Sequence, residues 1–137
     1  MSAQKAAATR YLDDVLSTRR IEMADELLTD DVVVTAPGVT MEGIAELKEF
    51  LSAGAVSFPT RDVVIEEQIE EGDQLACIFR LVMEHVGEYQ GLPPTGRPVD
   101  VTGVNVFRFE GERIGEIRVF YNAMEVMEQL GALDSAS

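Results

Sequence analysis

The chain contains a single histidine, His85, which ends a stretch of residues with alternating apolar character. Alternate side chains of an extended strand point to the same face, so His85 would lie on the same face as Cys77 and Met83. An imidazole ordinarily titrates near neutral pH and can act as a general acid or base. The competing interpretation is a core histidine that is hydrogen-bonded to a backbone carbonyl. His85 is therefore a candidate catalytic residue, with that alternative open.

Arg118 and Asn122 form a second candidate constellation. Both lie on one face of a predicted last strand, together with Phe120. A guanidinium and an amide at this spacing could hold and polarise a carbonyl or enolate oxygen. Arg118 could instead pair with Glu116. Asn122 could also cap the next helix, because Glu125 three residues later completes a capping-box-like pattern.

Two further polar residues fall among apolar neighbours. Asn105 shares a predicted strand face with Gly103 and Phe107, and Tyr11 lies on the apolar side of a predicted first helix. Asn105 could be a satisfied buried amide, and Tyr11 could be a core aromatic residue. Alternatively, both polar groups could reach a pocket. The expected substrate-binding residues are Tyr11, Met83, Asn105 and Phe120.

The residue inventory excludes several kinds of site. The sequence has no phosphate-binding glycine loop and no Gly-x-Ser-x-Gly motif. One Cys and one His cannot supply the three or four ligands of a Cys/His zinc site, so we expect no metal site. The apolar neighbours of Cys77 predict a buried thiol rather than a reactive one.

Charge and hydropathy restrict the partners. The 11 Lys and Arg residues against 25 Asp and Glu residues give a net charge of −14, which repels nucleic acids and anionic membrane surfaces. The simplest role of this acidity is solubility. No apolar run approaches the ~20 residues of a membrane helix. The first residues also lack the apolar core of a signal peptide, so we expect a cytoplasmic protein.

The pattern predicts one α+β domain over residues 1–137. Residues 1–28 have helical periodicity, and residues 31–36 read as a strand. Thr40 is expected to cap a helix that ends near Gly54 and Pro59. Period-two segments then predict strands at 62–70, 74–89, 99–110 and 113–121, followed by a helix over 123–130. This order favours a curved antiparallel sheet with helices on its inner face, which leaves a pocket for a small apolar ligand.

One segment carries a more specific signal. Residues 85–97 read His-Val-Gly-Glu-Tyr-Gln-Gly-Leu-Pro-Pro-Thr-Gly-Arg. This segment resembles the His-x-Gly-x-Phe-x-Gly-x-Pro-Pro-Thr-Gly-Arg signature of SnoaL-like polyketide cyclases. Gln129-Leu130-Gly131 also matches the Gln-Leu-Gly that closes the last helix of that family. The resemblance implies the cone-shaped fold of the nuclear transport factor 2 superfamily.

The resemblance also implies a chemistry. Such cyclases close the last ring of aromatic polyketides by an intramolecular aldol reaction, without a metal or an organic cofactor. A base removes a proton from a carbon flanked by carbonyls, and the enolate attacks a carbonyl of the same small apolar or aromatic molecule. A positioned base and a shaped cavity can suffice for so acidic a carbon.

The sequence departs from the family at the base. The family places an aspartate seven residues before the Gln of Gln-Leu-Gly, where this chain has Asn122. An amide cannot accept a proton at neutral pH. The family often has a tryptophan four residues earlier, where this chain has Arg118. Three explanations stay open: His85 has become the base, Arg118 and Asn122 bind an oxyanion in a different reaction, or the protein binds a ligand without converting it.

Two functions are therefore carried forward. The first is a cofactor-independent cyclase acting on a polyketide-like molecule. The second is a small-molecule-binding or non-aldol member of the same scaffold, for example one that opens epoxides or isomerises its substrate. Members of the superfamily commonly assemble through the outer face of the sheet. We therefore expect a homo-oligomer, with a dimer as the first expectation.

Overall fold

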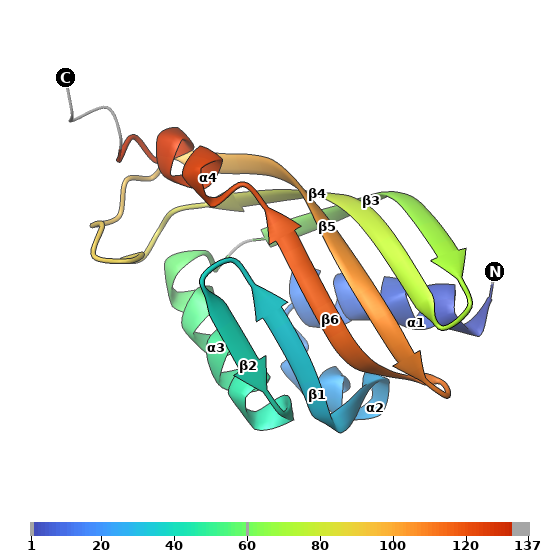
Figure 1. Cartoon of the computed structure of the whole chain (residues 1–137). Helices are drawn as coiled ribbons and strands as arrows, with labels where there is room; N and C mark the ends of the chain where they lie inside the picture. The colour runs from blue at the N-terminus through green and yellow to red at the C-terminus, as the bar shows by residue number, and fades with distance from the viewer. Residues whose placement is uncertain (1, 60, 133–137) are drawn as a thin grey trace.

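A curved, unclosed sheet of six strands organises the chain in the computed structural model, which describes residues 2–59 and 61–132 (Figure 1). The strands are β1 (Leu28–Ala36), β2 (Val39–Glu42), β3 (Arg61–Glu71), β4 (Gln74–Glu84), β5 (Pro98–Glu110) and β6 (Arg113–Tyr121). They lie in the order β2-β1-β6-β5-β4-β3. The β1–β6 pair is parallel, and the other neighbouring pairs are antiparallel. The α+β class is thus confirmed.

Tight turns join the long strands as the sequence predicts. Gly72 lies between β3 and β4 with φ +60°, and Gly111 lies between β5 and β6 with φ +65°. Glycine adopts this left-handed backbone conformation without the steric strain of a Cβ atom. The two hairpins fix the register of four strands, and with it the face to which each side chain points.

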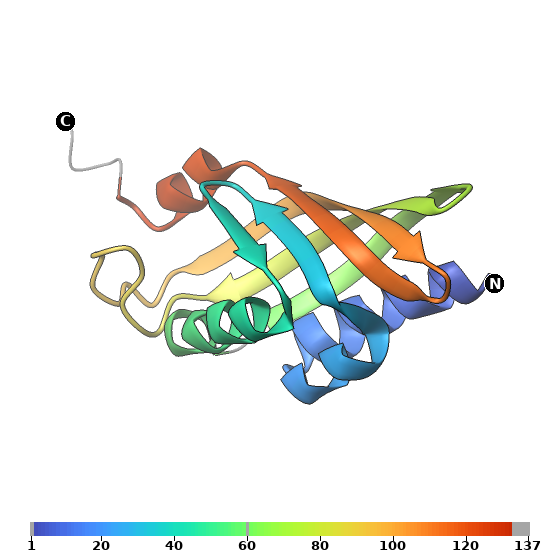
Figure 2. The ribbon, with the colours of Figure 1, turned by 60° about the horizontal axis from the view of Figure 1, so that its bottom comes forward.

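Helices pack against the inner face of the sheet. They are α1 (Ala3–Arg10), the π-helix η1 (Tyr11–Ser17), the 3₁₀ turn η2 (Ile21–Met23), α2 (Ala24–Leu27), α3 (Ile44–Ser57) and α4 (Ala123–Gln129). Figure 2 shows α1 and α3 along the same side of the strands. The Ser2 side chain caps α1 by accepting a hydrogen bond from the Lys5 backbone N–H. The core between the layers includes Leu12, Cys77 and Phe107, all fully buried, so the buried thiol is confirmed.

Two local expectations are wrong. Thr40 does not cap a helix, because it pairs with Thr35 in the short β1–β2 hairpin. Helix α3 begins after Gly43, which has φ +92° and makes no side-chain cap. The strand predicted over 74–89 ends at Glu84. Beyond that point the chain leaves the sheet as a loop over residues 85–97.

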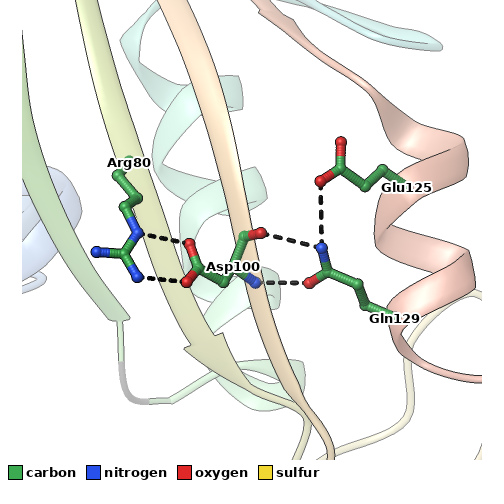
Figure 3. Close-up of polar contacts among 4 residues, drawn as sticks. All are labelled: Arg80, Asp100, Glu125 and Gln129. Atoms are coloured by element: carbon green, nitrogen blue, oxygen red, sulfur yellow. Dashed lines mark hydrogen bonds and ion pairs between the residues drawn. The ribbon is translucent and has the colours of Figure 1, made fainter.

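Besides the apolar packing of Val126 and Leu130, the side chain of Gln129 holds helix α4 on the sheet. The Gln129 amide receives a hydrogen bond from the Asp100 backbone N–H (2.7 Å) and donates one to the Asp100 carbonyl (2.9 Å) (Figure 3). The same amide donates to the Glu125 carboxylate, and Arg80 holds the Asp100 carboxylate with two N–H groups. Gln129 thereby adds a strand-like pair of hydrogen bonds to β5 and fixes α4 at that end of the sheet.

Candidate functional site

A cavity of about 170 Å³ lies between the inner face of the sheet and the helices. Side chains of η1, α3, β1, β3 to β6 and α4 line it. Six of the lining residues are aromatic: Tyr11, Phe50, Phe58, Phe79, Tyr89 and Tyr121. An engineered apolar cavity of roughly 150 Å³ holds benzene. The present cavity therefore has room for a small aromatic group and offers it flat, apolar walls.

Three of the predicted substrate-binding residues border this cavity, namely Tyr11, Met83 and Asn105. Asn105 is only 1% exposed, and its Oδ1 has no hydrogen-bond partner in the described part of the chain. The alternative interpretation, in which Asn105 is a buried amide with all its hydrogen bonds made, is therefore wrong. A buried acceptor without a partner is rare in folded proteins. In a cavity wall, a donor group on a ligand would satisfy it.

Tyr11 is fixed by packing. Its ring meets the edge of Phe107 at a centroid distance of 5.9 Å, and the side chain is buried. Burial raises the pKa of the Tyr11 phenol well above its ordinary value, so this group stays protonated at physiological pH. Burial also raises the pKa of Tyr89 and Tyr121. The phenols of this wall are therefore neutral hydrogen-bonding groups.

Two arginines complete the cavity wall, and sequence reasoning missed both. Arg61 donates through Nε to the Leu16 carbonyl (2.8 Å), whereas its Nη2 is buried without a partner among the described residues. Arg19 has a left-handed backbone (φ +59°) and donates to carbonyls after and near the end of α3. Arg61 alternates with Val63 and Ile65 along β3. That period-two pattern could have placed its guanidinium on the inner face.

His85 lies behind the cavity wall. It is fully buried in the loop after β4, with ring centroids of Phe58 at 5.5 Å and Tyr89 at 6.4 Å. The Thr95 backbone N–H donates to Nδ1 (3.2 Å), so the neutral ring carries its proton on Nε2. That Nε2 has no partner in the described residues. In this arrangement the ring can donate a hydrogen bond from Nε2, whereas the lone pair of Nδ1 already accepts one from Thr95.

The prediction that Arg118 and Phe120 face this cavity is wrong, because both side chains point to the outer face of the sheet. Asn105 pairs directly with Val119 across β5 and β6, so Val119 shares the inner face and its neighbours in sequence point outward. Both Arg118 and Phe120 are exposed and border a separate hollow on the outer face. Glu116 pairs with Arg108 (3.4 Å) rather than with Arg118.

Asn122 is the N-cap of α4, as the alternative interpretation predicts. Its Oδ1 accepts a hydrogen bond from the Glu125 backbone N–H (3.2 Å), and the residue is exposed. It does not line the cavity in this structure.

Carboxylates and metal-binding clusters are not part of this wall. Among residues 2–59 and 61–132, no Asp or Glu lines the cavity. The same residues contain no group of three or more His, Cys, Asp or Glu side chains that could hold a metal ion. Within the described helices, none is long and apolar enough to cross a membrane. The cavity is thus an apolar space with neutral and cationic polar groups.

Gly103 controls the volume of the cavity. A Cβ atom at this position would stand 2.8 Å from Cζ of Phe79, whose ring lines the cavity. We expect Gly103→Ala to push that ring aside, to lower the free energy of unfolding by about 1–3 kcal/mol, and to weaken binding in the cavity. Urea unfolding measures the first effect.

Gly54→Ala is the matched control for Gly103→Ala. Gly54 also borders the cavity but lies within α3 with open space around its Cα. Alanine is the better helix former, so this change is expected to stabilise by up to about 1 kcal/mol. Wild-type stability in Gly103→Ala would contradict the assigned packing.

The sequence profile of SnoaL-like polyketide cyclases matches residues 6–130. A candidate SnoaL-like polyketide cyclase from Jannaschia sp. CCS1 is 26% identical, with a TM-score of 0.88 over 95% of this chain and 92% of that one. A candidate polyketide cyclase from Streptomyces antibioticus is 22% identical (TM-score 0.82; 93% and 98% covered). A candidate hydroxylase from Streptomyces galilaeus is 21% identical (TM-score 0.83; 95% and 82% covered). Curated protein sequences give no significant match.

Proposed function

We propose that this chain, which belongs to the SnoaL-like polyketide cyclase family, closes a ring in a polyketide-like small molecule held in the inner cavity. The observation that carries the proposal is the unpartnered Asn105 Oδ1 in a largely apolar, aromatic wall. Apolar walls hold the carbon skeleton in a reactive fold, and a few fixed polar groups orient its oxygens.

The proposed reaction is an intramolecular aldol addition that needs no cofactor. A carbon between two carbonyls loses a proton, and the resulting enolate carbon bonds to a carbonyl carbon of the same molecule. The new alkoxide then takes up a proton. In this proposal the Tyr11 hydroxyl donates to a substrate oxygen, and Asn105 Oδ1 accepts from an enol hydroxyl. Tyr11 stabilises developing negative charge, Asn105 orients the substrate, and neither group changes its own protonation state.

The proposed mechanism requires a group that accepts the proton. His85 stays the proposed acid/base residue, as the sequence suggests, and it would have to release the Thr95 N–H before Nδ1 could take a proton. Asn122 cannot take the proton, since it is an amide whose oxygen caps α4. A second candidate function, ligand binding without turnover, is favoured by one observation: no carboxylate of the described residues lines the cavity.

Turnover by the wild type and by Asn122→Asp separates these functions. The substrate is a tricyclic aromatic polyketide ester of the kind that the family cyclises, and the product is followed by chromatography. We expect wild-type turnover, with Asn122→Asp unchanged within about twofold, because aspartate also caps helices well. Turnover by Asn122→Asp alone would mean that the wild type has lost its base. Saturable binding without product in either protein would support the ligand-binding function.

The expected dimer and cytoplasmic location stay predictions. The outer face of the sheet carries exposed apolar side chains, with Val64 49% and Phe120 52% exposed. Such residues are what a contact between two copies would cover. We propose this face for the homodimer.

A further inference from the structure

The cavity has the opposite charge sign to the whole protein. The chain carries a net charge of −14, yet the charged side chains that line the cavity in the described structure are Arg19 and Arg61. A protein this rich in carboxylates has many groups that could neutralise a buried guanidinium. Neither arginine forms an ion pair with a described carboxylate. Each arginine must therefore have another role that accounts for its position.

Arg19 has a structural role that accounts for it. Its guanidinium donates to the carbonyls of Leu51, Phe58 and Pro59. Phe58 and Pro59 lie just beyond the carboxyl end of α3, where unpaired carbonyls and the helix dipole carry partial negative charge, whereas Leu51 lies within the helix. The positive-φ backbone of Arg19 turns the chain toward them. Arg19 is thus a cap for α3.

Arg61 has no comparable set of partners. Among the described residues its guanidinium has one hydrogen bond, from Nε to the Leu16 carbonyl, and Nη2 is buried and unpaired. A buried charged donor left without a partner destabilises the fold more than a buried neutral donor does, because its lost hydration is not replaced. Burial and the nearby charge of Arg19 lower the pKa of Arg61 to about 10, so it stays a cation at neutral pH. Its charge is available for a partner that residues 2–59 and 61–132 do not supply.

Tyr11 lines the same cavity as Arg61 and belongs to η1, the helix whose Leu16 carbonyl accepts the Arg61 hydrogen bond. Its neutral hydroxyl can donate to an oxygen that also faces the guanidinium. A planar guanidinium and a phenol hydroxyl together suit an anionic oxygen, since guanidinium groups bind carboxylates through paired N–H donors. The aromatic walls suit the rest of a flat ligand.

We propose that Arg61, with the hydroxyl of Tyr11, forms a subsite for an anionic oxygen, either a carboxylate or an ionised enol, on an otherwise apolar ligand. This inference rests on the proposed use of the cavity and adds to it the charge of the substrate. The natural ligand then carries a negative charge at neutral pH, on a carboxylate or on an ionised enol, and Arg61 selects for it.

Binding of matched acidic and neutral probes tests the subsite without any turnover. The carboxylate pair is trans-cinnamate and trans-cinnamamide, and the enol pair is 2-acetylcyclohexane-1,3-dione and its enol methyl ether. Calorimetric titration of the wild type is expected to show at least one acid binding about tenfold or more tighter than its neutral partner. Preference for cinnamate identifies a carboxylate ligand, and preference for the triketone alone identifies an enolate.

Variants assign the preference to Arg61. In Arg61→Gln the acid and its neutral partner are expected to bind within about twofold of each other, whereas Arg61→Lys keeps part of the preference because it keeps the charge. Arg80→Gln removes the same charge from the exposed partner of Asp100 and is expected to keep the full preference. Should Arg61→Gln fail to fold, the wild type and Arg61→Lys still decide the question.

Three results would overturn the subsite: equal binding of acid and neutral probes by the wild type, no saturable binding of either acid, or an undiminished preference in folded Arg61→Gln. Failure of the cyclase proposal is a different result. A wild type that prefers acids but forms no product from any polyketide contradicts the cyclase and leaves the subsite standing. A wild type that cyclises a neutral ester but shows no preference for acids contradicts the subsite alone.

Discussion

Replacing His85 with alanine is expected to lower the free energy of unfolding by about 3 kcal/mol, whether or not the residue takes part in chemistry. The side chain is fully buried, and its ring contacts those of Phe58 and Tyr89. Alanine leaves a cavity where the ring was and leaves the Thr95 N–H without its acceptor. Urea unfolding monitored by circular dichroism gives the change.

His85→Asn separates the packing role from the catalytic one. An asparagine oxygen can stand near the position of Nδ1 and accept the Thr95 N–H, so we expect a loss about 1 kcal/mol smaller than for alanine. If His85 is the acid or base, this folded variant loses turnover by 10²-fold or more, the order that general acid–base catalysis contributes. If it only packs the loop, turnover stays near the wild-type value. An alanine variant as stable as the wild type would contradict the structure itself.

The strands were predictable because two signals agree. Apolar residues alternate along β3 to β6. A turn with a glycine beside acidic residues joins β3 to β4, and a similar turn joins β5 to β6. Strand β2 was not predictable by the same means, since it has only four residues and Thr40 is equally suited to a helix cap. The end of β4 depends on contacts of His85 with residues ten and twelve positions later. The Thr95 N–H donates to the His85 ring, and the His85 N–H donates to the Arg97 carbonyl.

The site was predictable only where the strand face was unambiguous. Asn105 lies between Gly103 and Phe107 on a face whose other members are buried, so its inward position follows from alternation. Strand β6 has apolar residues in both alternating sets, because its register shifts between Ile114 and Glu116 and the buried positions change from one set to the other. Its inward face is decided by pairing with β5, which puts Val119 opposite Asn105 and turns Arg118 outward. Arg61 was missed because a charged residue at the start of a strand ordinarily faces water.

A last prediction concerns Gly87, a glycine of the family-like segment 85–97. An added Cβ would stand 2.1 Å from the carbonyl oxygen of Val56 and 2.8 Å from its carbonyl carbon. Backbone cannot yield as a side chain can, so Gly87→Ala must move the loop away from α3 or distort the helix end. We expect the free energy of unfolding to fall by about 3 kcal/mol, at the upper end of overpacking effects. Urea unfolding measures the loss.

Gly91→Ala in the same loop shows which property of glycine matters at Gly87. Gly91 has φ +80° but open space around its Cα, so alanine there is strained only by its backbone conformation, by about 1 kcal/mol. Gly87 has no positive φ, and its requirement is the absence of a side chain. The loop lies against α3 through hydrogen bonds from Val86 and Gly87 to the Ser57 carbonyl. This loop also carries Tyr89, which lines the cavity. Gly87→Ala is therefore expected to weaken ligand binding as well as to lower the free energy of unfolding. Equal losses of stability in Gly87→Ala and Gly91→Ala would contradict the close approach of Gly87 to Val56.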